Sequence, residues 1–195
     1  VTLTGTYVRE DLPQFGRSIE IAAKGQAIVT AASLGLVADQ PAGVRWSASE
    51  AVVATSAEYQ QGDADSTTPT TVAGTQFRFG DAFINTSTAG SEQFETLYLY
   101  NPTGLSNTVT INLVFFDGST SSFTTTIRAR GFAEVKLHER PEIITQRSGP
   151  QWFGVDLASN LPFAATMVHY DLAVNGGWAT TGIPLGLLNP LSSIS

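Results

Sequence analysis

The stretch Val109–Phe116, VTINLVFF, nearly repeats the first eight residues of the chain, Val1–Val8, VTLTGTYV. Two further pairs of stretches follow in the same order: Ile21–Val29 resembles Ile127–Val135, and Val52–Tyr59 resembles Phe163–Tyr170. The offsets between the paired stretches lie between 106 and 111 residues. The repetition therefore predicts a duplicated module of about a hundred residues, which is the usual size of a domain.

Strand signals dominate both copies. Apolar, aromatic and β-branched residues alternate with polar ones over short runs, and turn residues such as Asp117-Gly118 separate the runs. The clearest predicted strands are Phe94–Tyr100, Val109–Phe116, Phe123–Arg128, Phe132–Leu137, Trp152–Leu157 and Phe163–Tyr170. Short strands at this spacing predict an all-β fold, with two tandem antiparallel β-sandwich modules of immunoglobulin-like or jelly-roll character.

The predicted modules are unequal. We expect a first module at residues 1–83, a polar, turn-rich linker at 84–93 and a second module at 94–195. The second module opens with the strand Phe94–Pro102, and no equivalent precedes Val1. The first module therefore lacks its opening strand, which leaves an open apolar edge.

The C-terminal segment offers a strand for that gap. Leu185–Pro190, LGLLNP, resembles Leu97–Pro102, LYLYNP. Three interpretations are open: the segment is simply a final strand, it closes its own chain, or it is donated to a neighbouring molecule. In the last case we expect Val1, Leu3 and Tyr7 on the accepting edge, and Leu185, Leu187 and Leu188 on the donated strand.

Composition excludes several classes of function. The 195 residues carry a net charge of −7, and only 14% are charged. Nucleic-acid binders need a basic surface, and anionic lipid repels an acidic one, so neither partner is expected. The chain has no cysteine and no apolar stretch of membrane-spanning length, so we expect neither disulfides nor membrane insertion. The composition favours an extracellular or cell-surface location, with the periplasm as an alternative.

The second module contains a series of strand and turn motifs that match a known family. The matching features are the strand end Asn101-Pro102, then VTINLVFFDG (Val109–Gly118), TIRARGFAEVKLHE (Thr126–Glu139) and FGVDLASNLPFAATMVHYD (Phe153–Asp171). By these features the second module resembles the sensory-rhodopsin-transducer-like β-sandwich family, and the first module matches that family more loosely. The resemblance implies a sandwich of the kind that recurs in bacterial surface proteins and tends to oligomerise, and a signalling adaptor is a third, weaker interpretation of function.

Catalytic patterns are missing. The two histidines, His138 and His169, are far apart in sequence, and no serine-hydrolase elbow is present. We therefore expect no enzyme and no cofactor, and we interpret both histidines as structural. Asp63 and Asp65 place carboxylates at every second position, as calcium-binding loops do. The Gly and Glu of an EF-hand loop are missing, so Asp63 and Asp65 are only a weak candidate for a metal site.

The aromatic residues suggest an alternative function. Trp46 and Trp152 occupy equivalent places in the two modules, which favours core packing. Trp178 follows a glycine-rich turn and is the tryptophan most expected at the surface, with Tyr98 and Tyr100 as companions. Such rings can stack on sugars. The leading hypothesis is that the chain is a non-enzymatic extracellular structural or adhesion protein that self-associates by edge-strand donation. The alternative hypothesis is that it is a carbohydrate-binding module of a secreted enzyme, and its partner would then be a polysaccharide.

Overall fold

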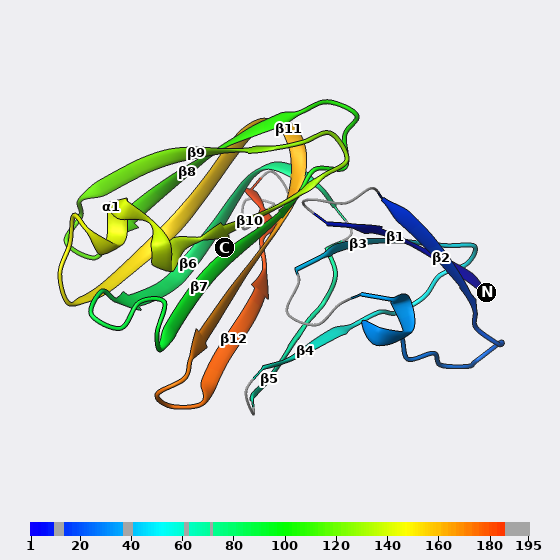
Figure 1. Ribbon diagram of the computed structural model, residues 1–195. Coiled ribbons are helices and arrows are strands. Elements are labelled where there is room, and N and C mark those ends of the chain that lie inside the picture. The colour runs from blue at the N-terminus through cyan, green and yellow to red at the C-terminus, as the bar shows by residue number, and fades with distance from the viewer. Residues whose placement is uncertain (10–13, 37–40, 61–62, 71, 186–195) are drawn as a thin grey trace, which may run out of the picture. The chain divides into compact units, whose positions relative to one another are not determined.

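A computed structural model describes residues 1–9, 14–36, 41–60, 63–70 and 72–185. The chain divides into two compact units, Val1–Ala54 and Thr55–Ser195, which we call the first and the second unit. Nearly all regular structure is β-strand, which confirms the predicted all-β class (Figure 1). Among the described residues no helix has the length and apolar character to cross a bilayer.

The first unit is built on one antiparallel sheet. Its strands are β1 (Thr2–Val8), β2 (Phe15–Glu20) and β3 (Gly43–Ala48), in the order β2-β1-β3, and a 3-10 turn η1 (Ala32–Leu34) lies between β2 and β3. Tyr7 stacks on Phe15 and meets the edge of Trp46, with ring centroids at 5.1 and 5.7 Å. These three rings, one from each strand, define the apolar face of the sheet.

The second unit is an antiparallel β-sandwich. Its elements in chain order are β4 (Ser56–Gln60), β5 (Asp63–Thr67), β6 (Gly74–Asn85), β7 (Gln93–Tyr100), β8 (Asn107–Phe115), β9 (Thr120–Ile127), β10 (Phe132–Lys136), η2 (Leu137–Glu139), α1 (Pro141–Ile144), β11 (Pro150–Asp171), β12 (Gly176–Thr181) and β13 (Ile183–Pro184). β4 and β5 form a hairpin with each other.

One long strand joins the two layers of the sandwich. The N-terminal half of β11 lies between β8 and β6, and its C-terminal half lies between β7 and β12 (Figure 1). The pairing register shifts between Ala158 and Phe163, where the sequence SNLP interrupts the alternation. The sequence predicts two separate strands here, whereas the chain forms one strand that bends from one sheet into the other.

The core lies between these two layers. Inward-facing side chains of both sheets contribute, including Phe77, Leu99, Leu113, Val155 and Met167, all almost completely buried. Burial alternates along β8, where Val109, Ile111, Leu113 and Phe115 point inward, as a strand with one face on a core requires.

The observed division differs from the predicted one. The chain separates after Ala54, not at residues 84–93, which span the end of β6, the turn that follows it and the first residue of β7. β6 pairs with β11 and buries Phe77 and Ile84 in the second unit's core. The polar turn 84–93 resembled a linker because turns and linkers share the same residues.

The two units repeat one pairing scheme. In the first unit β1 is the central strand between β2 and β3, and in the second β8 is the central strand between β9 and β11. A 3-10 turn, η1 or η2, precedes the last strand of each trio. In the second unit β6 then pairs with the far edge of β11, whereas the first unit's sheet ends at β3.

Candidate functional site

The predicted accepting edge of the first unit is not an edge. Val1 and Ile21 exchange backbone hydrogen bonds at 2.8 Å, and the Ser49 N–H donates to Thr2 O at 3.0 Å. Because antiparallel bonding alternates, the odd residues of β1 bond to β2 and the even ones to β3. The prediction that Val1, Leu3 and Tyr7 accept a strand is corrected, since the backbone of β1 is used on both sides.

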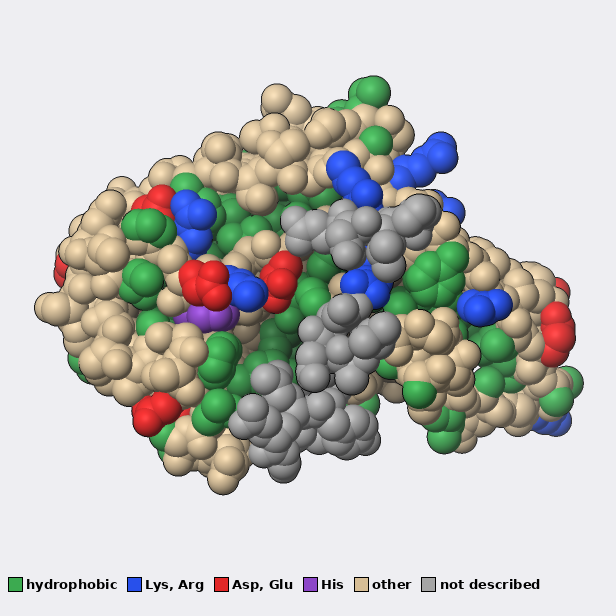
Figure 2. Space-filling view, in the orientation of Figure 1, with side chains coloured by type: hydrophobic (Ala, Val, Ile, Leu, Met, Phe, Trp, Pro, Cys, Tyr) green, Lys and Arg blue, Asp and Glu red, His purple; other side chains and the backbone are tan. Residues whose placement is uncertain are grey.

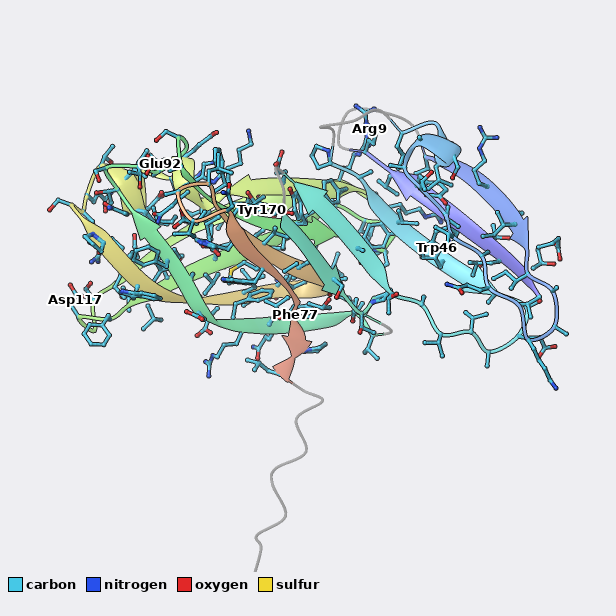
Figure 3. All side chains as sticks on the ribbon, turned by 90° about the horizontal axis from the view of Figure 1, so that it is seen from below. Arg9, Trp46, Phe77, Glu92, Asp117 and Tyr170 are labelled. Atoms are coloured by element: carbon cyan, nitrogen blue, oxygen red, sulfur yellow. The ribbon has the colours of Figure 1, made fainter. Side chains whose placement is uncertain are left out.

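The edge strands of this three-stranded sheet are β2 and β3, and the edge of β3 is the candidate for strand addition. The same alternation directs the N–H groups of Val44, Trp46 and Ala48 away from β1, and no described residue pairs with that side. Trp46 lies on this strand (Figure 3). Apolar side chains of the first unit also remain exposed, with Val44 at 38% and Ile28 at 82%. An unpaired edge beside an incompletely covered apolar face is a site for strand addition.

The predicted donor lies mostly beyond the part of the chain that can be described. Leu185 directly follows β13 and is half-buried, while Leu187 and Leu188 fall outside the described residues. β13 pairs with β6 through Ile183 and Pro184. The strand-donor role of these leucines therefore stays a prediction.

Trp178, Tyr98 and Tyr100 do not form one surface. Residues directly opposite each other on neighbouring strands share a face, and Trp178 lies opposite His169, which lies opposite Glu95. All three point toward the core side, where Trp178 stacks on His169 with centroids at 5.8 Å. Tyr98 and Tyr100 alternate with buried Leu97 and Leu99 and point to the other face of the sheet.

A buried carboxylate–imidazole pair is the polar feature that the sequence did not reveal. Glu95 on β7 is completely buried, and its Oε2 lies 2.7 Å from Nδ1 of His169 on β11. His138, from η2, places its own Nδ1 3.1 Å from the Glu95 backbone N and 3.0 Å from the Glu95 backbone O. The two histidines thus meet around one residue of β7, although nothing in their sequence spacing indicated it.

Both groups of the pair bind their protons more tightly than usual. Burial raises the pKa of Glu95 to about 6, although the hydrogen bond and charge of His169 oppose this shift. Burial lowers the pKa of His169, but the hydrogen bond to Glu95 and the charges of Glu95, Asp171 and Asp81 outweigh it and leave that pKa raised. A buried pair of this kind costs desolvation, so we interpret it as a structural element that fixes the register of β7 and β11.

The charged groove between β9 and β10 has no dominant sign. It is lined by Phe123, Glu134, Lys136, Glu139 and Arg140, among others. Lys136 lies 3.5 Å from Glu139, and Figure 2 shows acidic and basic side chains next to each other on this face. The Arg140 guanidinium stacks 3.9 Å above the Phe123 ring. Mutually paired charges give a nucleic acid no basic track to follow.

The weak calcium candidate is not supported by its backbone setting. Asp63 and Asp65 lie in β5, paired with Gln60 and Glu58 of β4. Their side chains are outside the described part of the structure. Elsewhere in the described chain no group of three or more acidic or histidine side chains is placed to hold a metal ion.

Comparison with known proteins gives structural neighbours only. No family model matches the sequence, and no curated protein matches it significantly. A Thermotoga maritima structure, protein 1070, is similar with a TM-score of 0.49 and 16% identity, covering 57% of this chain and 95% of that chain. The Anabaena sensory rhodopsin transducer is similar with a TM-score of 0.41 and 17% identity, and the match covers 51% of this chain and 91% of the transducer chain. A sensory rhodopsin transducer is thus among the structural neighbours, as the sequence resemblance predicted.

Proposed function

We propose that this protein is a non-enzymatic structural or adhesion protein, located outside the cell or on its surface, that assembles by strand donation between copies. The proposal rests chiefly on one observation: the first unit ends at β3, whose outward N–H groups face no described partner. This location of the accepting edge replaces the one expected from the sequence.

The second unit supplies the pattern for a complete sheet. There the strand equivalent to β3, the N-terminal half of β11, carries β6 on its far edge. A strand added beside β3 would bond to the N–H groups of Val44, Trp46 and Ala48. Its apolar side chains would cover the face that Tyr7, Phe15 and Trp46 form and remove apolar surface from water.

The chain contains a segment of suitable sequence. Leu185–Pro190, LGLLNP, follows β13, which stays paired with β6, and this segment resembles Leu97–Pro102, LYLYNP. Donation of this segment to β3 of the next molecule joins two different surfaces. Contacts of this head-to-tail type repeat without limit unless the rotation closes a ring.

Sedimentation velocity over a concentration series tests the proposal. We expect wild-type protein to form polymers, and we expect two variants to remain monomeric: a deletion of residues 186–195, and Ala48→Pro. Proline at position 48 removes an N–H that points away from β1, so the sheet of the first unit keeps its own hydrogen bonds.

Ala48→Thr is the matched control, because threonine retains the N–H and favours a strand. It should polymerise like wild type. A wild-type chain that stays monomeric at high concentration, or an Ala48→Pro variant that polymerises normally, would contradict strand donation at β3. Circular dichroism of each variant verifies that the sheets are intact.

A further inference from the structure

A row of exposed aromatic side chains crosses the outer face of the sandwich. Phe116, Trp152 and Phe83 lie on three neighbouring chain segments and opposite one another: Phe116 N donates to Trp152 O at 2.9 Å, and Trp152 pairs with Phe83. We call these three residues the aromatic row. It lies next to the turn marked by Asp117 in Figure 3.

The aromatic row is not part of the core. Its neighbours Phe115 and Phe153 point inward and are buried, so the alternation of the strands turns Trp152 outward. Phe116 is 92% exposed and Trp152 is 53% exposed, which corrects the prediction that Trp152 packs in the core. The Trp152 and Phe83 rings touch, with centroids at 4.3 Å, and this contact holds them in place.

A polar row runs parallel to the aromatic one on the same face. Asp156 lies two outward positions beyond Trp152 along β11 and is opposite both Asn112 and Arg78. Arg78 donates from Nε and Nη2 to the two carboxylate oxygens of Asp156 at 2.6 and 3.0 Å. Both side chains remain partly exposed to solvent, Arg78 at 61% and Asp156 at 33%. The bidentate pair is planar and holds its hydrogen-bonding groups in fixed positions.

Gly154 separates the two rows. It faces outward between Trp152 and Asp156 and has no side chain, so the surface is lower along β11 there, with the 42% exposed Val114 opposite on β8. Ring faces, a gap and a polar row therefore follow one another along a single strand. The residues of the polar row carry no net charge, because Arg78 and Asp156 neutralise each other and Asn112 is neutral.

We propose that this outer face is a binding site for an uncharged polysaccharide that lies along the N-terminal half of β11. One sugar presents its C–H face to the Trp152 ring, and the chain continues across Gly154. Hydroxyl groups of a following sugar bond to Asp156, Arg78 and Asn112. A polyhydroxylated neutral chain matches both features, since it offers apolar ring faces and many hydrogen-bonding groups without charge.

The site is independent of strand donation. It consists only of residues of the second unit, on a face formed by β8, β11 and β6. It also replaces Trp178, Tyr98 and Tyr100 as the place where a sugar would bind, because those three rings point to opposite faces of one sheet.

Affinity electrophoresis of the full chain tests the proposal. The gels contain hydroxyethyl cellulose, xylan, galactomannan or laminarin as neutral probes, and alginate as an anionic one. We expect at least one neutral polysaccharide to retard the wild-type protein, and we expect Trp152→Ala to weaken that binding about tenfold, as loss of a ring contact predicts. Gly154→Val, which fills the gap, should weaken it similarly.

Tyr98→Ala is the matched control, since Tyr98 lies on the other sheet of the sandwich, and it should bind like wild type. The 186–195 deletion should also bind normally, which separates this site from assembly. Three results would overturn the proposal: no retardation by any neutral probe, equal binding by Trp152→Ala, or retardation by alginate alone. A protein contact at this face would instead appear as altered sedimentation of Trp152→Ala without any loss of retardation, and this too would overturn it.

Discussion

At the scale of single residues, Glu95 shows how a strand tolerates a carboxylate in its core-facing row. Glu95, Leu97 and Leu99 occupy every second position of β7, and both leucines are completely buried, so the Glu95 side chain points into the sandwich with them. His169 is directly opposite on β11 and supplies a hydrogen bond of 2.7 Å. Without that partner the buried carboxylate would be strongly unfavourable.

The pair makes stability depend on pH. The pKa of Glu95 rises from 4.5 to about 6 on folding, so the native state holds its proton longer than the unfolded chain. The raised pKa of His169 acts in the same direction. The free energy of unfolding should therefore fall as the pH rises from about 4.5 to above 6.5, with Glu95 contributing on the order of 2 kcal/mol. Urea unfolding at a series of pH values measures this slope.

Glu95→Gln should remove or reverse the slope. The substitution removes the carboxylic acid and with it the charged partner of His169. Burial then lowers the pKa of His169, so the free energy of unfolding rises with pH across the range in which His169 loses its proton. Glu139→Gln, at a carboxylate whose side chain is 62% exposed, is the control and should retain the wild-type slope. An unchanged slope in Glu95→Gln would show that other groups dominate the pH dependence.

At the scale of elements, the sheet of the first unit depends on a glycine beneath an aromatic ring. Gly5 on β1 pairs with Trp46 on β3. A Cβ atom at Gly5 would lie 2.5 Å from the Trp46 ring and 2.7 Å from the Tyr7 hydroxyl. The glycine in VTLTGTYV is therefore a packing requirement, because the tryptophan covers the position that a side chain would fill.

Gly5→Ala should destabilise the first unit by about 1–3 kcal/mol, since the two rings must shift to admit the methyl group. Gly104→Ala is the matched control, because a Cβ there would contact nothing within 4 Å, and it should be neutral or slightly stabilising. Urea unfolding followed by tryptophan fluorescence measures both. Equal stability of the two variants would contradict the close packing of Trp46 over Gly5.

At the scale of the whole molecule, the two units have very unequal cores. Among the described residues of the first unit only Tyr7, Val8 and Leu34 are buried large apolar residues, whereas the second unit buries a continuous cluster drawn from both sheets. Because stability grows with the apolar surface that folding buries, the first unit should be the weaker one. Strand donation would supply what it lacks.

We expect two unfolding transitions, with the first unit unfolding at the lower denaturant concentration. Trp152→Phe with Trp178→Phe leaves Trp46 as the only tryptophan, so its fluorescence reports on the first unit alone. If donation occurs, the midpoint of this transition should rise with protein concentration. A single concentration-independent transition, seen equally by fluorescence and circular dichroism, would contradict this account.

The sequence by itself determined where most strands run. Alternation and turn residues are local signals, and they located the strands at 94–100, 109–116, 123–128 and 132–137 closely. Such signals indicate which residues form a strand, but not which strand lies beside it. The edge residues of the first unit were therefore wrong, and β6 was assigned to the wrong unit.

Only the tertiary structure decided the contents of the sites. Glu95 and His169 are 74 residues apart in sequence, and the aromatic row joins Phe83, Phe116 and Trp152 from three segments. Trp46 and Trp152 occupy equivalent places in the repeat, yet one packs over Gly5 and the other lies exposed. A side chain's exposure depends on what the rest of the fold places against it, and the residue's own surroundings in sequence do not contain that information.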